Sequence, residues 1–387
     1  MREEWKYKKL GEVCTIKAGY TPQKNELSDN GAYPYYKVAD MNTLGNDVYL
    51  DITSSYKIDA NKLFPKGAIV FPKNGAAVST NKKRILKYDS IVDLNTGVAI
   101  FPKSINEKFA YYWFIDTDFK KYVRGGALPT LDIKSLKDKP FPSIDKSIQL
   151  AIVSELDKIN ELIRLKKEQL KDFDNLAQSI FYEMFGDPVE NEMGWEVKKL
   201  SSLFKVSSSK RIMQEEWTKE GVPFLKVSDI VSLIKYGEVS PSTFISQLKF
   251  EKLEKANMVP MVGDILITSR GTLGLCYTIK TGDKFYFQDG MVTWLSENSG
   301  NIIPIYITYL FSNNHFLEVL AERANKSTVS YISIKQISQK KITIPPLPLQ
   351  HLFAQRIEQI EHQKAEVQKA ITDLETLLAS RMQYWFE

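Results

Sequence analysis

The sequence contains little cysteine and histidine, and it has no long apolar run. Its 387 residues include two cysteines, Cys14 and Cys276, and three histidines. The cysteines stand alone, without a CxxC pair or a nearby histidine pair, which argues against a zinc ribbon and a disulfide framework. No stretch of about 18 apolar residues occurs, and the N-terminus lacks the apolar segment of a signal peptide. We therefore expect a cytoplasmic protein with no membrane span and no metal site.

Common catalytic signatures are also missing. The sequence has no G-x-x-x-x-G-K-[ST] phosphate loop, no G-x-S-x-G nucleophile elbow and no H-E-x-x-H zinc helix. The histidines, His315, His351 and His362, fall on expected helices without metal-ligand spacing. We expect no catalytic residues and no cofactor.

The charge is unevenly distributed along the chain. The formal net charge is only +5, which many ordinary soluble proteins share. By segment, however, it is +7 over residues 1–143, −4 over 144–190, +4 over 191–343 and −2 over 344–387. Basic blocks thus alternate with acidic ones.

This alternation coincides with an internal repeat. Residues 5–10 (WKYKKL) recur as 195–200 (WEVKKL), and residues 33–40 (YPYYKVAD) recur as 222–229 (VPFLKVSD). Residues 66–71 then match 262–267, and the LDI at 131–133 with its following Pro142 and Gln149 matches the ISI at 332–334 with Pro345 and Gln350. The order is preserved, which indicates a duplication. The alternative is two unrelated α/β domains with similar turns.

Each copy begins with about 145 residues of mixed pattern. Short β-type runs are expected at 68–71, 264–268 and 275–279, with one apolar helix at 109–123 in the first copy and one at 305–320 in the second. Turns with glycine and proline separate the strands. This pattern is typical of a mixed α/β globule.

A long amphipathic helix follows each globule. Residues 147–185 contain neither glycine nor proline, and apolar residues recur at steps of three and four, as they do after residue 346. At 1.5 Å per residue, a helix of about 40 residues is about 60 Å long, too long for one neighbouring domain to cover. We therefore expect the two helices to form an antiparallel coiled coil, with each helix acting as a dimerisation zipper or lying along its own domain as the alternatives. The expected seam is Ile159, Ile163, Leu170, Phe173, Ile360, Val367, Ile371 and Leu374.

Together these features resemble the specificity subunits of type I restriction-modification enzymes. The resemblance covers the whole chain and rests on the two W-x-x-K-K-L segments, the KVAD and KVSD segments, GDIL at 263–266 and IPPLPLQ at 344–350. The first copy departs from the pattern at 66–69 (KGAI), which lacks the aspartate, and at 141–145 (FPSID), which lacks the second proline. The resemblance implies an α+β architecture: target-recognition domains at 1–145 and 187–345, and spacer helices at 146–186 and 346–387.

The resemblance also implies a function. Each target-recognition domain would read one half of a split, asymmetric sequence in double-stranded DNA, and the helices would set the gap. The expected partners are methylation subunits, two of them, and restriction subunits. The [N/D]-P-P-[F/Y] tetrad of adenine methyltransferases is absent, because residues 344–347 (IPPL) lack both the polar and the aromatic residue. We expect a non-catalytic subunit; an unrecognised DNA-modifying enzyme and a scaffold that does not bind DNA are the alternatives.

Basic and forked polar side chains on turns are the candidates for DNA contact. In each case the alternative is a solvated surface turn. Tyr20, Tyr35 and Tyr36 could stack on DNA, although aromatic residues near strands are more often core. The candidates in the first domain are Lys73, Asn74, Lys82, Lys83, Arg84 and Arg124, and those in the second are Lys210, Arg211, Ser269, Arg270, Thr272, Arg323 and Lys326.

Overall fold

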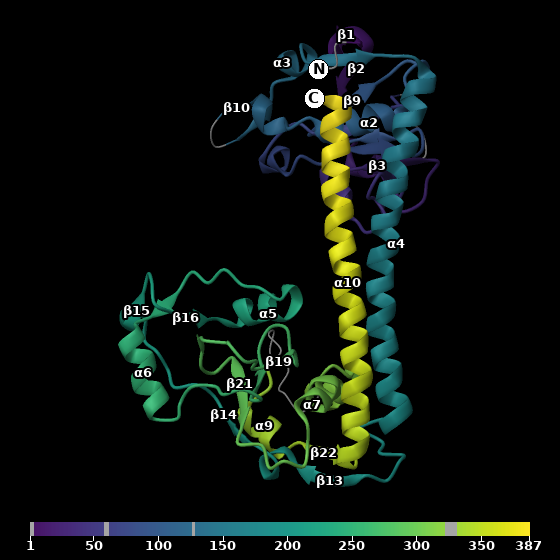
Figure 1. Ribbon diagram of the computed structural model, residues 1–387. Coiled ribbons are helices and arrows are strands. Elements are labelled where there is room, and N and C mark those ends of the chain that lie inside the picture. Colours follow the sequence, from purple (N-terminus) through teal and green to yellow (C-terminus); the bar gives the residue numbers. More distant parts are fainter. Residues whose placement is uncertain (1–3, 58–61, 126–127, 322–330) are drawn as a thin grey trace. The chain divides into compact units, whose positions relative to one another are not determined.

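The computed structural model describes residues 4–57, 62–125, 128–321 and 331–387 (Figure 1). The chain divides into two compact units. Unit 1 consists of residues 1–167 and 369–387, and unit 2 of residues 168–368. Each unit therefore contains one globule, part of the helix α4 (Lys146–Phe185) and part of the helix α10 (Leu347–Phe386).

Unit 1 is built on a five-stranded sheet in the order β2-β9-β6-β7-β4. A three-stranded sheet, β5-β3-β8, and the pairs β1-β12 and β10-β11 complete its strands among the described residues. The strands are β1 (Lys6–Lys9), β2 (Thr15–Ala18), β3 (Tyr33–Tyr36), β4 (Tyr49–Leu50), β5 (Tyr56–Lys57), β6 (Ile69–Pro72), β7 (Arg84–Leu86), β8 (Ile91–Val92), β9 (Thr96–Ile100), β10 (Val123–Arg124), β11 (Thr130–Leu131) and β12 (Pro140–Ser143).

Three short helices accompany these strands: α1 (Leu10–Val13), α2 (Glu107–Asp116) and α3 (Ile133–Lys137). The core lies between the sheet and α2, whose residues Phe109–Phe114 are all buried. The single helix expected over 109–123 is wrong, because α2 ends at Asp116. Thr117 turns its hydroxyl back to the Trp113 carbonyl, and Asp118 caps a separate 3-10 turn at Phe119–Tyr122.

Unit 2 repeats this plan. A sheet in the order β14-β21-β18-β19 stands beside a sheet in the order β15-β17-β16-β20 and the pair β13-β22. The strands are β13 (Glu196–Lys199), β14 (Lys205–Ser207), β15 (Trp217–Thr218), β16 (Val222–Leu225), β17 (Phe244–Ile245), β18 (Ile265–Thr268), β19 (Cys276–Thr278), β20 (Tyr286–Phe287), β21 (Val292–Ser296) and β22 (Lys341–Ile344).

The helices of unit 2 are α5 (Val227–Tyr236), α6 (Gln247–Lys255), α7 (Pro304–Phe311), α8 (Asn314–Ala321) and α9 (Ile334–Gln339). The single helix expected over 305–320 is also wrong, because it is divided into α7 and α8. The side chain of Asn313 accepts a hydrogen bond from the Phe316 N–H at 2.8 Å, which starts a new helix there.

The repeated sequence motifs occupy equivalent places in the two units. In unit 1, the WKYKKL segment forms β1, which pairs antiparallel with the proline-containing β12. In unit 2, the WEVKKL segment forms β13, which pairs in the same way with β22. The backbone N–H groups of Leu10 and Leu200 then bond the Lys139 and Lys340 carbonyls, both at 2.9 Å. These matched strand pairs close each globule at the point where its long helix begins.

A buried glutamine fixes the first turn of each long helix. The Gln149 side chain accepts from the Asn106 N–H at 2.8 Å and donates to the Ser104 and Ile144 carbonyls. Gln350 accepts from the Ile303 N–H at 2.9 Å and donates to the carbonyls of Asn301 and Pro345. Three backbone groups that would otherwise be unpaired are satisfied by one side chain in each copy.

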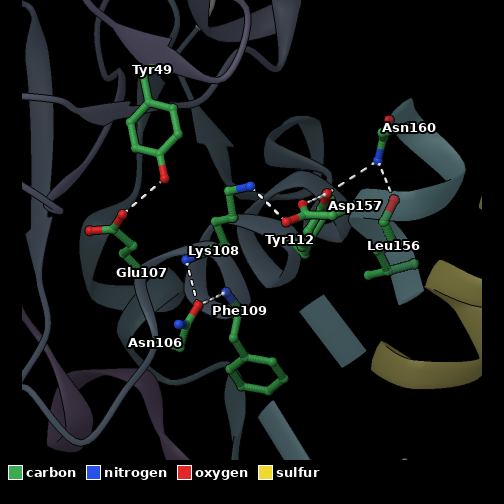
Figure 2. A network of polar contacts seen from close by, with 9 residues as sticks. All are labelled: Tyr49, Asn106, Glu107, Lys108, Phe109, Tyr112, Leu156, Asp157 and Asn160. Atoms are coloured by element: carbon green, nitrogen blue, oxygen red, sulfur yellow. Dashed lines mark hydrogen bonds and ion pairs between the residues drawn. The ribbon is translucent and has the colours of Figure 1, made fainter. Parts of the chain in front are cut away.

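Polar contacts also join α2 to α4 in unit 1, as Figure 2 shows. Asp157 of α4 accepts a hydrogen bond from the Tyr112 hydroxyl at 2.6 Å and pairs with the Lys108 ammonium, also at 2.6 Å. Asn160, one turn further along α4, donates to the Tyr112 hydroxyl at 3.2 Å. These bonds fix the rotation of α4 about its axis against the globule.

Within each unit, α4 and α10 contact one another in opposite chain directions. In unit 1, Lys167 pairs with Glu375 at 2.8 Å and Glu155 pairs with Arg381. In unit 2, Asp174 pairs with Lys364 at 2.8 Å, and Phe181 packs on Phe353 with ring centroids 5.7 Å apart. Of the expected seam, Ile159, Ile163, Ile360, Val367 and Ile371 are buried, and Leu170, Phe173 and Leu374 are half-buried.

Replacing the unit 2 glutamine should destabilise the fold measurably. Gln350→Leu keeps a similar volume but leaves the Ile303 N–H and two carbonyls without their partner, which should lower the free energy of unfolding by about 1–3 kcal/mol. Urea unfolding followed by circular dichroism measures this loss. Gln355→Leu, at an exposed position on the same helix, should change the value by no more than about 0.5 kcal/mol. Equal effects of the two variants would contradict the assigned role of Gln350.

Candidate functional site

Three loops of unit 1 meet at the residues that follow β6. The Lys73 N–H bonds the Asn95 carbonyl, the Leu131 N–H bonds the Lys73 carbonyl, and the Gly75 N–H bonds the Pro129 carbonyl, each at 2.8 Å. Asp93 braces the middle loop by accepting from the Asn95 N–H and the Thr96 hydroxyl. The loops are therefore held mainly by main-chain hydrogen bonds, which leave most of their side chains for other contacts.

A cavity of about 610 Å³ opens beside this junction. Its wall includes Lys37, Asn74, Asp93, Asn95 and Leu128, together with the small residues Gly75, Ala76 and Ala77. Leu128 is 80% exposed, which is unusual for a leucine that is not at an interface. Sequence reasoning selected Asn74 but missed Asn95 and Leu128, which lie 21 and 54 positions further along the chain and meet it only through the loop junction.

Among the other candidates of unit 1, Lys73 and Arg124 lie at the junction and Lys82 lies beyond it. Lys73 is half-buried, and Arg124 is 69% exposed and forms an ion pair with Asp132. Arg124 pairs in register with Thr130, and Thr130 in turn bridges to Asn74. The structure thus brings Asn74 and Arg124 to the same junction. Lys82 lies beyond it, half-buried and bonded to the Asn42 side chain.

The structure corrects the expectation that Lys83 and Arg84 contact DNA, because both side chains are bonded inside the protein. The Lys83 ammonium is fully buried, donates to the Asn81 side chain at 2.6 Å and to the Thr117 carbonyl at 2.7 Å, and lies 4.0 Å from the centre of the Phe119 ring. It cannot reach a phosphate. The Arg84 guanidinium donates to the backbone carbonyls of Met41, Asn46 and Lys83, so its donors serve the protein's own loops.

Burial also changes the titration of Lys83. Removal from water lowers the pKa of Lys83 to about 7; the nearby Asp118 and Asp116 oppose this effect, and Lys139 adds to it. Lys139 is half-buried, and its partial removal from water lowers its pKa as well. The two ammonium groups share Thr117, since Lys139 donates to its hydroxyl at 2.7 Å. Lys83 is therefore a structural group that ties the end of the 73–84 segment to the turn after α2.

Unit 2 has the same loop junction after β18. The Ser269 N–H bonds the Met291 carbonyl at 2.9 Å, and the Ile332 N–H bonds the Ser269 carbonyl at 3.0 Å. Ser269 is buried, and its hydroxyl forms a hydrogen bond with that of Thr293. The expectation that Ser269 contacts DNA is therefore corrected, because Ser269 is an internal residue of the junction. Arg270 and Thr272, which follow it, are exposed.

The remaining candidates of unit 2 lie elsewhere or outside the described residues. Lys210 is exposed and borders a separate cavity of about 880 Å³. Arg211 is exposed and ion-paired with Asp289 at 2.8 Å. Arg323 and Lys326 lie outside the described residues.

Groups suited to covalent or metal chemistry are not gathered at either junction. No cluster of three or more histidine, cysteine, aspartate or glutamate side chains that could hold a metal ion occurs in the described ranges. Both cysteines are buried, which raises the pKa of Cys14 to about 12 and that of Cys276 still further from its ordinary value. Neither thiol would ionise at neutral pH. Of the helices in the described part of the chain, none is long and apolar enough to cross a membrane.

Comparison with known proteins agrees with this architecture. The family model for the type I restriction modification DNA specificity domain matches residues 2–172 and again residues 192–376. The chain therefore belongs to the type I restriction-modification specificity subunit family, and it carries the family's domain twice. This confirms the duplication and the family expected from the sequence.

Relatives match over nearly the full length. A type I restriction enzyme specificity subunit of Haemophilus influenzae is 24% identical over 92% of this chain and 88% of its own. The MjaIX specificity subunit of Methanocaldococcus jannaschii is also 24% identical, over 97% of this chain and 91% of its own. A solved structure described under complex assembly and conformational transition of the type I restriction-modification system is similar in fold, with a TM-score of 0.63 and 19% identity, and the match covers 100% of this chain and 98% of that one.

Lys83 should make stability depend on pH in a defined direction. In the unfolded chain Lys83 returns to its ordinary pKa of 10.5, whereas in the folded chain the pKa is about 7. Between these values the unfolded chain binds the extra proton, so stability rises as the pH rises. Relative to Lys83→Met, the native protein should gain up to about 1.4 kcal/mol per pH unit between about pH 7.5 and pH 9.5. Urea unfolding at several pH values measures the gain.

The half-buried neighbour Lys82 provides the control. The stability of Lys82→Met should change with pH in parallel with that of the native protein. A gap between native protein and Lys83→Met that stays constant with pH would contradict the burial of a titrating Lys83.

Proposed function

We propose that this chain is the DNA-reading subunit of a type I restriction-modification enzyme and recognises an asymmetric target of two separated half-sites in double-stranded DNA. The observation that carries the proposal is the loop junction that recurs in both units on matching backbone bonds but with different side chains. Loops held by a rigid scaffold are suited to reading base edges, and two unlike readers on one chain suit two unlike half-sites.

We further propose that α4 and α10 pair along their length as an antiparallel coiled coil that sets the distance between the half-sites. The pairing directions within the two units support this, because each unit contains the beginning of one helix and the end of the other. An antiparallel pair relates its two ends by an approximate twofold axis, as duplex DNA does.

The partners follow from the family. We propose that the chain positions methylation subunits, two per chain, and restriction subunits around the DNA, and that it contributes no catalytic group itself. Exposed leucines on α4 support a protein partner on the helices: Leu150, Leu162, Leu165 and Leu176 are each close to half exposed. Such side chains on a long helix mark a surface that another chain covers.

Two other functions make different predictions for the purified full chain. A scaffold that does not bind DNA would show no affinity for duplex that weakens with salt, whereas a phosphate-contacting protein loses affinity steeply. An unrecognised DNA-modifying enzyme would transfer methyl groups from S-adenosylmethionine to DNA without any added subunit. The proposed function requires salt-dependent binding and no such transfer.

Exchange of one domain should change one half of the target. Residues 1–143 of this chain are replaced by the equivalent domain of a relative with a known target, and the methylated sequence is mapped across a genome that also expresses the methylation subunits. Because each globule has its own sheets and its own junction, we expect one half-site to take the donor's sequence while the other half-site and the spacer persist. The reciprocal exchange of residues 191–343 is the control and should change the other half. If either exchange alters both halves together, each globule does not read one half-site.

A further inference from the structure

The two loop junctions place one residue of each unit at an equivalent position. The backbone N–H groups of Lys73 and Ser269 donate to the carbonyls of Asn95 and Met291, respectively. Their carbonyls accept from the N–H groups of Leu131 and Ile332, respectively. The next residue in each copy then forms an isolated antiparallel bridge, Asn74 with Thr130 and Arg270 with Tyr331. Asn74 and Arg270 are therefore structural counterparts.

The residue after each counterpart strengthens the match. Gly75 and Gly271 both have a φ of +77°, a conformation that side chains rarely adopt. Apart from the glycine itself and its two chain neighbours, no heavy atom of the described residues lies within 4 Å of the place where a Cβ would stand at either position. Among the described residues, both turns thus leave open space beside the counterpart residue, which another molecule's backbone or base edge could approach.

In unit 1 two amides and one leucine border the open space, together with the charged Lys37 and Asp93. Asn74 and Asn95 both border the cavity of about 610 Å³, and their side chains are 3.4 Å apart, a long and weak hydrogen bond. Leu128 borders the same cavity. An amide that is held by so weak a bond can exchange it for a stronger one with a ligand.

In unit 2 the counterpart residue, Arg270, carries a guanidinium group. Arg124 and Arg211 are each held in an ion pair by an aspartate. Arg270 is exposed, and within the described ranges no carboxylate forms an ion pair with it. The described residues therefore leave its forked donors available to a planar acceptor pair.

The chemistry of the two side chains matches two different purines. An asparagine amide can donate to N7 or accept from N6 of adenine and can form both bonds at once, whereas an arginine fork donates to both O6 and N7 of guanine. An apolar side chain beside the amide suits the methyl group of the paired thymine. Leu128 meets this requirement in unit 1.

We propose that Asn74 reads an adenine in one half-site, with Leu128 against the methyl of its paired thymine, and that Arg270 reads a guanine at the equivalent place in the other. This rests on the proposed function, because it assumes that both junctions face DNA. It makes one position of each domain a determinant of the base recognised there and explains how a duplicated fold reads an asymmetric target.

The test exchanges the two side chains. The full chain, co-purified with the methylation subunits of its own enzyme, selects sequences from a duplex library with randomised half-sites. Asn74→Arg should change one A·T pair of one half-site to G·C, and Arg270→Asn should change one G·C pair of the other half-site to A·T, with the remaining positions and the spacer unchanged. Two control variants make the same change of charge at other exposed positions. They are Ser79→Arg in a turn of unit 1 and Arg356→Asn on α10. Both should select the native sequence.

A chemical probe covers the case in which an exchanged side chain does not fit. Asn74→Ala and Arg270→Ala should each make a single position degenerate. Replacing the one adenine or guanine by its 7-deaza analogue, which lacks N7, should weaken native binding by about 5- to 150-fold and should not weaken the matching alanine variant further.

Three results would overturn the inference. One is a variant that retains binding but selects the native sequence, and another is an alanine variant that weakens binding equally for all sequences, since that marks a phosphate contact. The third is an alanine variant that remains as sensitive to the 7-deaza analogue as the native chain. Failure of the proposed function is distinguishable, because the native chain would then select no two-part sequence at all.

Discussion

Each long helix carries an apolar stripe that its own globule cannot cover, and the rest of the structure follows from this constraint. A helix of 40 residues is about 60 Å long, about twice the diameter of a small domain. In unit 1 the core therefore includes Met382 and Phe386 from the end of α10, and Trp385 stacks on Trp5 with ring centroids 6.0 Å apart. In unit 2 the core includes Phe181 and Phe185 from the end of α4.

The consequence is that each globule is completed by a segment from the other half of the sequence. Unit 1 cannot form its core from residues 1–167 alone, because it also draws on residues 369–387. The Glu155 carboxylate accepts hydrogen bonds from Arg381 and from the Trp385 indole, and these bonds lower its pKa. Each globule is therefore held to both long helices within its own unit.

Recognition is separated from this frame. The strand pairs β1-β12 and β13-β22, the buried glutamines and two backbone bonds of each junction recur in both units, while the side chains of the residues that follow differ. Substitution at Asn74 or Arg270 would leave the backbone bonds in place, because those bonds use main-chain groups of neighbouring residues. The fold can therefore tolerate change at the positions where bases would be read.

The sequence predicted the helices that have a strong apolar periodicity. It missed the helix boundaries that are fixed by single polar side chains. The helices expected at 146–186 and 346–387 lie within one residue of α4 (Lys146–Phe185) and α10 (Leu347–Phe386) at each end. Neither helix has an internal helix breaker after its first turn, so the periodic pattern was sufficient to locate them. The expected helices at 109–123 and 305–320 were wrong at Thr117 and Asn313, where a side chain bonded to the backbone ends one helix or starts another.

Among the candidate site residues, the sequence could not separate Lys83 from its neighbours. A run of four basic and polar residues gives no sign of which side chain points inward, and only the packing of Phe119 and Thr117 around the ammonium decides it. Asn95 and Leu128 were missed for a different reason, because they join Asn74 through hydrogen bonds between loops far apart in sequence. Asn74 and Arg270 were among the candidates from the sequence because each follows a β-type run and precedes a glycine.

Hydroxyl-radical footprinting of the full chain on its selected duplex tests the central claim most directly, namely that one chain reads two separate half-sites through two equivalent junctions. The account predicts two protected segments of different sequence, separated by an unprotected gap of constant length, with Asn74→Ala weakening protection in only one segment and Arg270→Ala in only the other. A single continuous protected segment, or the loss of both segments together in either variant, would contradict it.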